Sequence, residues 1–169
     1  MKNVAFAAGL MLITASGWAA TGSASLVSTS SSSVQNGAVT FTDQAGGVRV
    51  QATFFNVTPG KHAFHIHEFG ACGDQGKAAG SHYNPGNAPH GLVMKDGMKH
   101  AHAGDMGNVE VNAKGEAALD VVVPGISLGD HNPIGGRAIV LHEKADDFSQ
   151  PAGNAGGRMA CGTIVITGK

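Results

Sequence analysis

The stretch HAFHIHEFGAC, residues 62–72, combines a strand-like pattern with three histidines and a cysteine. Successive side chains of a β-strand point to opposite faces, so His65 and His67 project on the same side, with Cα atoms roughly 6.5 Å apart. Two imidazoles placed in this way can converge on one metal ion. Exposed strand faces also carry such pairs by chance, so this pattern alone is weak evidence for a metal site.

The sequence around this stretch predicts an all-β fold. Segments that alternate in polarity or are rich in β-branched residues are separated by turn signals such as Thr58-Pro59-Gly60. The series fits an antiparallel sandwich or barrel, with predicted strands at 38–41, 48–57, 62–68, 108–111, 118–123, 137–143 and 162–166. The serine-rich run 28–33 is either a linker or, with Leu26 and Val27 before it, part of a frayed edge strand.

The first residues are typical of an export signal. Lys2 precedes an apolar segment, residues 4–13, that is too short to span a bilayer, and small residues follow it. Cleavage after Ala19 or Ala20 is expected, which gives a signal peptide at 1–19 and a single domain at 20–169. A buried first helix is the alternative. Export predicts a periplasmic or extracellular protein, with no membrane attachment after the signal is removed.

The overall charge gives no indication of nucleic-acid binding, because the formal net charge of the 169 residues is −1 and Lys and Arg form no run. The chain has only two cysteines, Cys72 and Cys161. In an oxidising compartment an isolated pair is most simply one disulfide, and two buried free thiols are the alternative.

Two long segments, 69–107 and 144–159, interrupt the series of predicted strands. Long irregular loops in a compact domain are usually functional or disordered. The first contains five candidate metal ligands, and imidazole together with carboxylate suits zinc: His82, His90, His100, His102 and Asp105. A histidine-rich loop in solvent is the alternative. His142, on the predicted strand 137–143, would add a third nitrogen to His65 and His67 if the two strands are neighbours.

Five segments in the same order resemble the copper–zinc superoxide dismutases, namely FHIHEFG, AGSHYNP, HAGDMGNV, GRAIVLHEKADD and GNAGGRMACG. The similarity covers nearly the whole chain, from about Ser23 to Ile166. It implies an eight-stranded antiparallel Greek-key barrel with two long functional loops, whose first strand would use the stretch near Leu26. It also implies dismutation of superoxide to O₂ and H₂O₂, with one copper and one zinc per chain.

The resemblance also implies a role for each residue of the expected site. Copper would be bound by His65, His67, His82 and His142, and zinc by His82, His90, His102 and Asp105, so that His82 bridges the two ions. Asp146 would link a copper histidine to a zinc histidine, and Cys72 and Cys161 would form the disulfide. Arg158 would hold the anionic substrate beside copper, with His82 as a proton donor. His62, His100 and His131 are expected not to be ligands, although His100 could compete for zinc.

The sequence departs from this family in ways that affect substrate steering and association rather than chemistry. The loop between His142 and Arg158 is short, and its SQPAG segment at 149–153 carries no charge. Thr163 stands where an aliphatic residue often helps to pair subunits, so a homodimer is left open. Two rival functions are a periplasmic copper or zinc storage or delivery protein, which has no use for Arg158, and an inactive interaction domain, which should have lost ligands.

Overall fold

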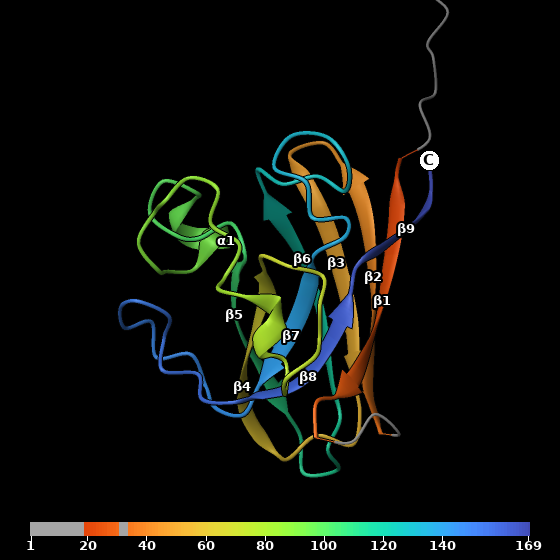
Figure 1. The fold of residues 1–169 in the computed structure, drawn as a ribbon, viewed down its shortest axis with the longest axis vertical. Coiled ribbons are helices and arrows are strands. Elements are labelled where there is room, and N and C mark those ends of the chain that lie inside the picture. Colours follow the sequence, from red (N-terminus) through yellow and green to blue (C-terminus); the bar gives the residue numbers. More distant parts are fainter. Residues whose placement is uncertain (1–18, 31–33) are drawn as a thin grey trace, which may run out of the picture.

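The structure is a computed structural model that describes residues 19–30 and 34–169. Over these residues, eight antiparallel strands form a nearly closed barrel in the order β5-β4-β7-β8-β1-β2-β3-β6, and β9 pairs with β1 (Figure 1). The strands are β1 (Thr21–Ser28), β2 (Gln35–Gln44), β3 (Gly47–Phe54), β4 (Gly60–His67), β5 (Asp105–Val111), β6 (Ala117–Pro124), β7 (Ala138–His142), β8 (Arg158–Thr163) and β9 (Val165–Gly168). The predicted all-β barrel is therefore confirmed, and this strand order is consistent with a Greek key.

Apart from Ala19, the predicted signal peptide lies outside the described residues. Within the described part of the chain, no helix is long and apolar enough to cross a membrane.

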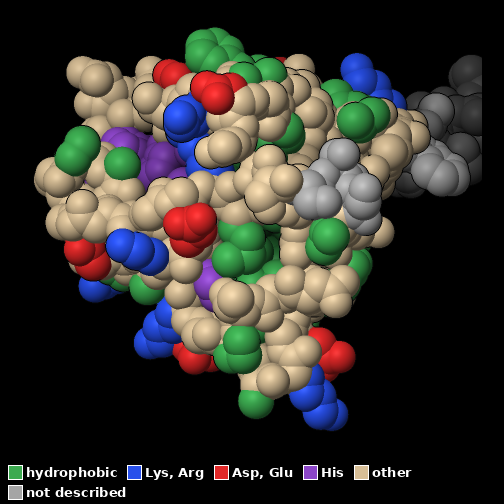
Figure 2. Space-filling view, turned by 60° about the horizontal axis from the view of Figure 1, so that its bottom comes forward, with side chains coloured by type: hydrophobic (Ala, Val, Ile, Leu, Met, Phe, Trp, Pro, Cys, Tyr) green, Lys and Arg blue, Asp and Glu red, His purple; other side chains and the backbone are tan. Residues whose placement is uncertain are grey.

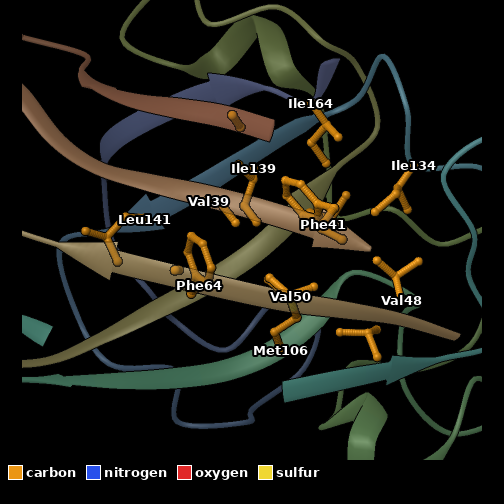
Figure 3. Packing of buried hydrophobic residues seen from close by; sticks show 14 of the residues in the cluster. Val39, Phe41, Val48, Val50, Phe64, Met106, Ile134, Ile139, Leu141 and Ile164 are labelled. Atoms are coloured by element: carbon orange, nitrogen blue, oxygen red, sulfur yellow. The ribbon is translucent and has the colours of Figure 1, made fainter. Parts of the chain in front are cut away.

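The barrel interior is filled by alternate side chains of its strands. In β3 every second residue from Val48 to Phe54 is buried and the intervening residues are exposed, as expected for a strand with one face in water. Phe41 of β2 and Phe64 of β4 pack in the same core (Figure 3). Phe54 makes an edge-to-face contact with Phe64 at 5.0 Å between ring centroids.

Strands β4 and β7 differ from β3 because their outward faces are covered as well as their inward faces. All residues of β7 are buried, as are those of β4 from His62 onward. Phe64 and Ile66 of β4 belong to the barrel core. On the outer side of the neighbouring strand, Ala138 and Val140 form a separate small apolar cluster with Ala79 and Cys161. The long loops thus cover the outer face of these two strands, which is the face that carries His65 and His67.

Three details of the predicted strands need correction. β1 lies between β2 and β8, so the segment before the serine run is an interior strand and not a frayed edge. Ser28, the first residue of the serine run, belongs to β1, and its N–H donates to the carbonyl of Val34 (2.8 Å), whereas residues 31–33 of the run lie outside the described residues. β3 ends at Phe54, three residues earlier than predicted, because Asn56 takes a left-handed conformation with φ 56°.

Candidate metal centre

Backbone register places the first candidate ligands. β4 pairs with β7 so that His65 lies opposite Val140 and His67 lies opposite Ala138. His142 ends β7, and its Nε2 is 3.2 Å from the Nε2 of His67. The predicted condition for a third nitrogen, that the two strands are neighbours, is therefore met.

The long loop returns along β4 and brings His82 to the same place. His67 and His82 form an isolated antiparallel bridge, and the N–H of Tyr83 donates to the carbonyl of Ile66 (2.8 Å). The N–H of Ile66 in turn donates to the carbonyl of Gly104 (3.0 Å). Gly104 approaches so closely that a Cβ there would overlap the carbonyl oxygen of Ile66. Hydrogen bonds to both the N–H and the carbonyl of Ile66 therefore hold the loop against β4, the strand that carries His65 and His67.

Three groups of described side chains could each hold a metal ion: the set His65, His90 and Asp146, which is described below, and two sets of four residues. In each group the candidate ligand atoms all lie within 4.8 Å of one another. We call the two sets of four the strand group, which consists of His65, His67, His82 and His142, and the loop group, which consists of His82, His90, His102 and Asp105. His82 belongs to both, which is the arrangement that a bridging ligand requires.

Asp105, the first residue of β5, is the centre of the loop group. Its carboxylate is fully buried and accepts hydrogen bonds from the Nδ1 atoms of His82 (2.8 Å) and His102 (3.1 Å). The Nδ1 of His90 lies 2.8 Å from its other oxygen, which also accepts from the N–H of Gly91 (3.0 Å). This carboxylate therefore orders three histidines that come from separate parts of the long loop.

Asp146 connects the two groups. Its carboxylate accepts from the Nε2 of His65 (2.9 Å) and from the Nε2 of His90 (2.9 Å), and all three side chains are buried. Carboxylates that hold the second nitrogen of a histidine fix its tautomer and orientation. The backbone of Asp146 pairs with the amide of Asn108, which donates to its carbonyl (2.9 Å) and accepts from its N–H (2.7 Å). Asn108 was not among the predicted site residues.

The donor sets fit metal ions. The Nε2 of His65 is held by Asp146, whereas its Nδ1 is buried and has no hydrogen-bond partner among the described residues. In the same way, the Nδ1 of His67 donates to the carbonyl of Gly80 (3.0 Å), which leaves its Nε2 to face the Nε2 of His142. The Nδ1 atoms of His65, His90 and His142 are buried without a hydrogen-bond partner among the described residues, and such buried polar atoms are costly unless a partner such as a cation satisfies them.

The electrostatics of the two groups are opposite. Burial and the neighbouring rings lower the pKa of His67 to about 2 and that of His142 to about 3. Burial alone would lower the pKa of His90 too, but the carboxylates of Asp105 and Asp146 outweigh it and raise this pKa to about 9. Burial would raise the pKa of Asp105, yet hydrogen bonds from the loop-group histidines hold it far below its usual range. His67 and His142 are therefore neutral at physiological pH, whereas His90 and Asp105 form a pair of opposite charges.

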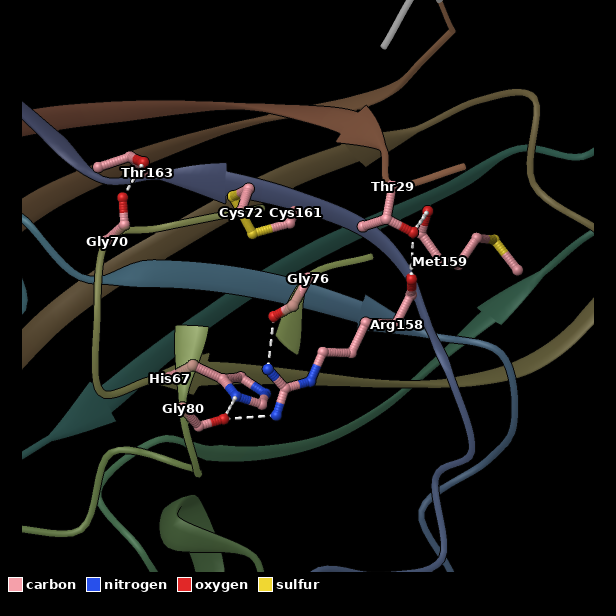
Figure 4. The surroundings of a disulfide bond; sticks show 10 residues. All are labelled: Thr29, His67, Gly70, Cys72, Gly76, Gly80, Arg158, Met159, Cys161 and Thr163. Atoms are coloured by element: carbon pink, nitrogen blue, oxygen red, sulfur yellow. Dashed lines mark hydrogen bonds between the residues drawn. A yellow bond between two sulfur atoms is a disulfide. The ribbon is translucent and has the colours of Figure 1, made fainter. Parts of the chain in front are cut away.

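An open pocket of about 740 Å³ leads from solvent to this centre. His67, His82, His142 and Arg158 line it, and Figure 2 shows histidine side chains at the bottom of a hollow with cationic side chains beside them. The guanidinium of Arg158 donates to the carbonyls of Gly76 and Gly80, so it is anchored at the pocket wall (Figure 4). Partial burial lowers its pKa from the usual value, but a guanidinium keeps its charge in proteins.

The predicted disulfide is confirmed. Cys72 and Cys161 are bonded, with Cα atoms 5.7 Å apart, and the bond joins the start of the long loop to β8 (Figure 4). Arg158 and Cys161 both lie on β8. The disulfide and the hydrogen bonds of the Arg158 guanidinium therefore hold the 72–80 segment against this strand at several points.

The remaining histidines lie outside both groups. His62 is buried, and its ring nitrogens lie at hydrogen-bonding distance from the carbonyl oxygens of His142 (2.9 Å) and Thr58 (2.8 Å). His100 and His131 are exposed. Gln150 and Phe148, which contact His90, were not predicted as site residues, because neither residue type is a signal for a metal site in sequence.

Comparisons with known proteins agree with the family suggested by the motifs. A family model described as copper/zinc superoxide dismutase matches residues 35–164. An extracellular superoxide dismutase (Cu-Zn) of Caenorhabditis elegans is 40% identical over 130 residues, which are 72% of this chain and 58% of that protein. The chain thus spans little more than half the length of this curated relative.

Two solved structures are similar in fold. The clock protein EA4 superposes with a TM-score of 0.77 at 36% identity, and the match covers 92% of this chain and 100% of that one. A double mutant of a SOD-like protein from Bacillus subtilis gives a TM-score of 0.74 at 32% identity, with 85% of this chain and 96% of that one covered.

Proposed function

The chain belongs to the copper/zinc superoxide dismutase family, and from this we propose that it is an exported enzyme that converts superoxide to O₂ and H₂O₂. The observation that carries the proposal is the pair of four-residue ligand groups that share His82 at the base of an open pocket. A protein that only stores metal needs ligands, but it needs neither a shared ligand nor a fixed cation at the pocket wall.

The strand group would hold copper, and the loop group would hold zinc, with one ion of each per chain. Four imidazoles suit a redox-active copper, whereas three imidazoles with a carboxylate suit a closed tetrahedral zinc site. Copper, when bound, supplies one-electron oxidation and reduction, and zinc holds the shared imidazole in place.

The protein residues have separate tasks in this reaction. Two superoxide anions and two protons give one O₂ and one H₂O₂. Arg158 attracts the anion and orients it at the pocket base with its planar guanidinium. Burial lowers the pKa of His82 to about 4, so its ring is neutral at physiological pH. Its Nδ1 faces Asp105, and its Nε2 would take up a proton and pass it on once the loop-group ion holds Nδ1. Asp146 fixes the rings of His65 and His90 throughout.

Three observations support the proposal that the protein is exported. The N-terminal sequence is typical of a signal peptide ending near Ala19, the disulfide requires an oxidising compartment, and the C. elegans relative is named as extracellular. We therefore assign the mature protein to the periplasm or the cell exterior.

The direct test is elemental analysis combined with a superoxide dismutation assay. Wild-type protein should contain one copper and one zinc per chain and show copper-dependent activity. His82→Ala should retain copper on three ligands, lose the magnetic or optical influence of the second metal, and bind zinc more weakly. His131→Ala changes an exposed histidine outside both groups and serves as the control.

Two results would contradict the proposal. One is a protein that, after incubation with copper, contains two zinc ions per chain and gives no copper signal. The other is copper- and zinc-loaded protein without dismutase activity, which would favour storage or delivery of metal instead.

A further inference from the structure

We propose that Phe148 and Gln150, here called the 148–150 latch, slow the release of zinc from the loop group by immobilising His90, although neither residue is a ligand. The inference depends on the zinc assignment proposed above. It concerns the short loop between β7 and β8, which projects on the same side of the barrel as the segment that carries His90 (Figure 1).

Gln150 holds the backbone of His90 in both directions. The N–H of His90 donates to Oε1 of Gln150 (2.9 Å), and Nε2 of Gln150 donates to the carbonyl of His90 (2.9 Å). The two bonds join residues that are 60 positions apart in the sequence. One amide that makes both bonds fixes the orientation of the peptide as well as its position, as a step of a β-ladder does.

Phe148 acts on the ring side of the same histidine. Its ring lies nearly parallel to that of His90, with centroids 6.4 Å apart and planes at 20°. Its N–H donates to Oδ1 of Asp146 (2.8 Å), and this oxygen accepts from Nε2 of His90. His90 is thus held by its backbone through Gln150 and by its ring through Asp146, which Phe148 supports.

Phe148 adopts a backbone conformation that is unfavourable for an aromatic residue, which indicates that its contact with His90 compensates for the cost. Its φ of 60° is left-handed, and the residue is 43% exposed. A bulky aromatic residue is disfavoured in that region, and such strain persists where surrounding contacts compensate for it, commonly at functional sites. Asparagine or glycine would meet the backbone requirement at lower cost, so the aromatic ring itself needs an explanation.

Gly153 completes the packing of this loop on the same pair. Its φ is 72°, and a Cβ at this position would overlap the carboxylate of Asp146 and lie 2.7 Å from Nε2 of His90. The loop therefore contacts the Asp146–His90 pair at Phe148, Gln150 and Gly153. Other bonds of the loop, such as that from Asn154 to Ser149 (2.9 Å), stay within it and do not reach His90.

Immobilising one ligand affects the rate of metal release more than the geometry of the site. Zinc leaves when a ligand detaches and swings away before it can rebind. A histidine whose backbone and ring are both restrained returns to the same position, so each detachment is followed by rebinding. His90 lies on an irregular segment and not on a strand, which makes an added restraint effective there.

The experiment measures zinc release from full-length, copper- and zinc-loaded protein into an excess of chelator. Gln150→Met keeps the length of the side chain and removes both hydrogen bonds. Phe148→Asn relieves the left-handed strain and removes the ring. We expect each variant to release zinc roughly tenfold faster, the size expected for the loss of one or two net hydrogen bonds or the equivalent packing. Copper content and copper spectra should be unchanged.

Ser149→Ala is the matched control, because it removes a hydrogen bond within the loop that does not reach His90. The melting temperature of the metal-free protein is measured in parallel, and Phe148→Asn should leave it equal or higher. Unchanged zinc release in both latch variants overturns the latch alone, as does equal acceleration in Ser149→Ala. Wild-type protein that retains no zinc overturns the latch together with the proposed zinc site.

Discussion

The strand group and the loop group share His82 and are both built from four side chains, yet they are positioned by different means. Three members of the strand group lie on β4 and β7, where hydrogen-bonded register fixes them. Most of the loop group comes from irregular segments that are held by Asp105, the disulfide and contacts with the 144–157 loop. The comparison indicates that the barrel forms one site, whereas the other needs a charged network to exist at all.

The largest difference between the two groups is expected when Asp105, the centre of the loop group, loses its charge. Asp105→Asn keeps the shape of the side chain but removes a fully buried charge that accepts bonds from two histidines and from Gly91. We expect a loss of zinc binding and a destabilisation of about 3–5 kcal/mol, the cost of breaking a buried charged network. Elemental analysis and denaturant unfolding measure both. Loss of copper to the same extent would show that the two groups are not independently positioned.

The disulfide should affect the loop group more than the strand group. Replacing Cys72 and Cys161 together by serine opens a loop of 89 residues, and the chain-entropy model gives a loss of roughly 4 kcal/mol. Zinc affinity should fall further than copper affinity, because Cys72 begins the loop that carries His82 and His90. Competition titrations with each metal measure the two affinities. Equal losses of affinity for copper and zinc would show that the disulfide stabilises the barrel as a whole and not the loop group in particular.

The pH dependence of the metal-free protein sharpens the electrostatic difference. His67 and His142 have folded pKa values of about 2 and 3, below the usual 6.5, so their contribution is present above pH 6.5 and is lost as the pH falls. Between pH 6.5 and its folded pKa, each residue changes the free energy of unfolding by up to about 1.4 kcal/mol per pH unit. His90, with a raised pKa of about 9, contributes in the opposite sense: its stabilisation is present below pH 6.5 and is lost as the pH rises through 9.

Unfolding by denaturant over this pH range measures both limbs. His90→Gln should remove the alkaline limb and leave the acid limb in place. A metal-free protein that becomes more stable as the pH falls below 6.5 would contradict the electrostatic difference between the two groups.

The smallest expected effect concerns Arg158, which lines the pocket and which we propose attracts the substrate anion to the strand group by its charge. Arg158→Glu should retain both metals and lower the second-order rate by about tenfold, within the range of charge steering, and Arg158→Lys should fall between the two. The rate should decrease with salt, because exposed charges are screened beyond about 10 Å at 0.1 M. Equal rates for the three proteins at low ionic strength would leave Arg158 as a structural anchor of the Gly76 and Gly80 carbonyls.

The sequence determined much of this protein directly. Alternation of polar and apolar residues predicts most of the strands, because one face of a strand must be buried, and the same period places His65 and His67 side by side. Ordered motifs also indicated the family, and with it the full set of histidines. The interior position of the strand before the serine run is not encoded locally, because it depends on pairing with β8, which lies at the other end of the chain.

What only the tertiary structure decided are the contacts between segments that are distant in the sequence. The amide of Gln150 on the backbone of His90, the left-handed Phe148 beside the same ring, and the pairing of Asn108 with Asp146 depend on how two loops fold over one face of β4 and β7. No local preference encodes them, because each bond forms between residues whose spacing along the chain carries no period. They exist because the barrel brings both loops to one face, where buried polar groups must find partners.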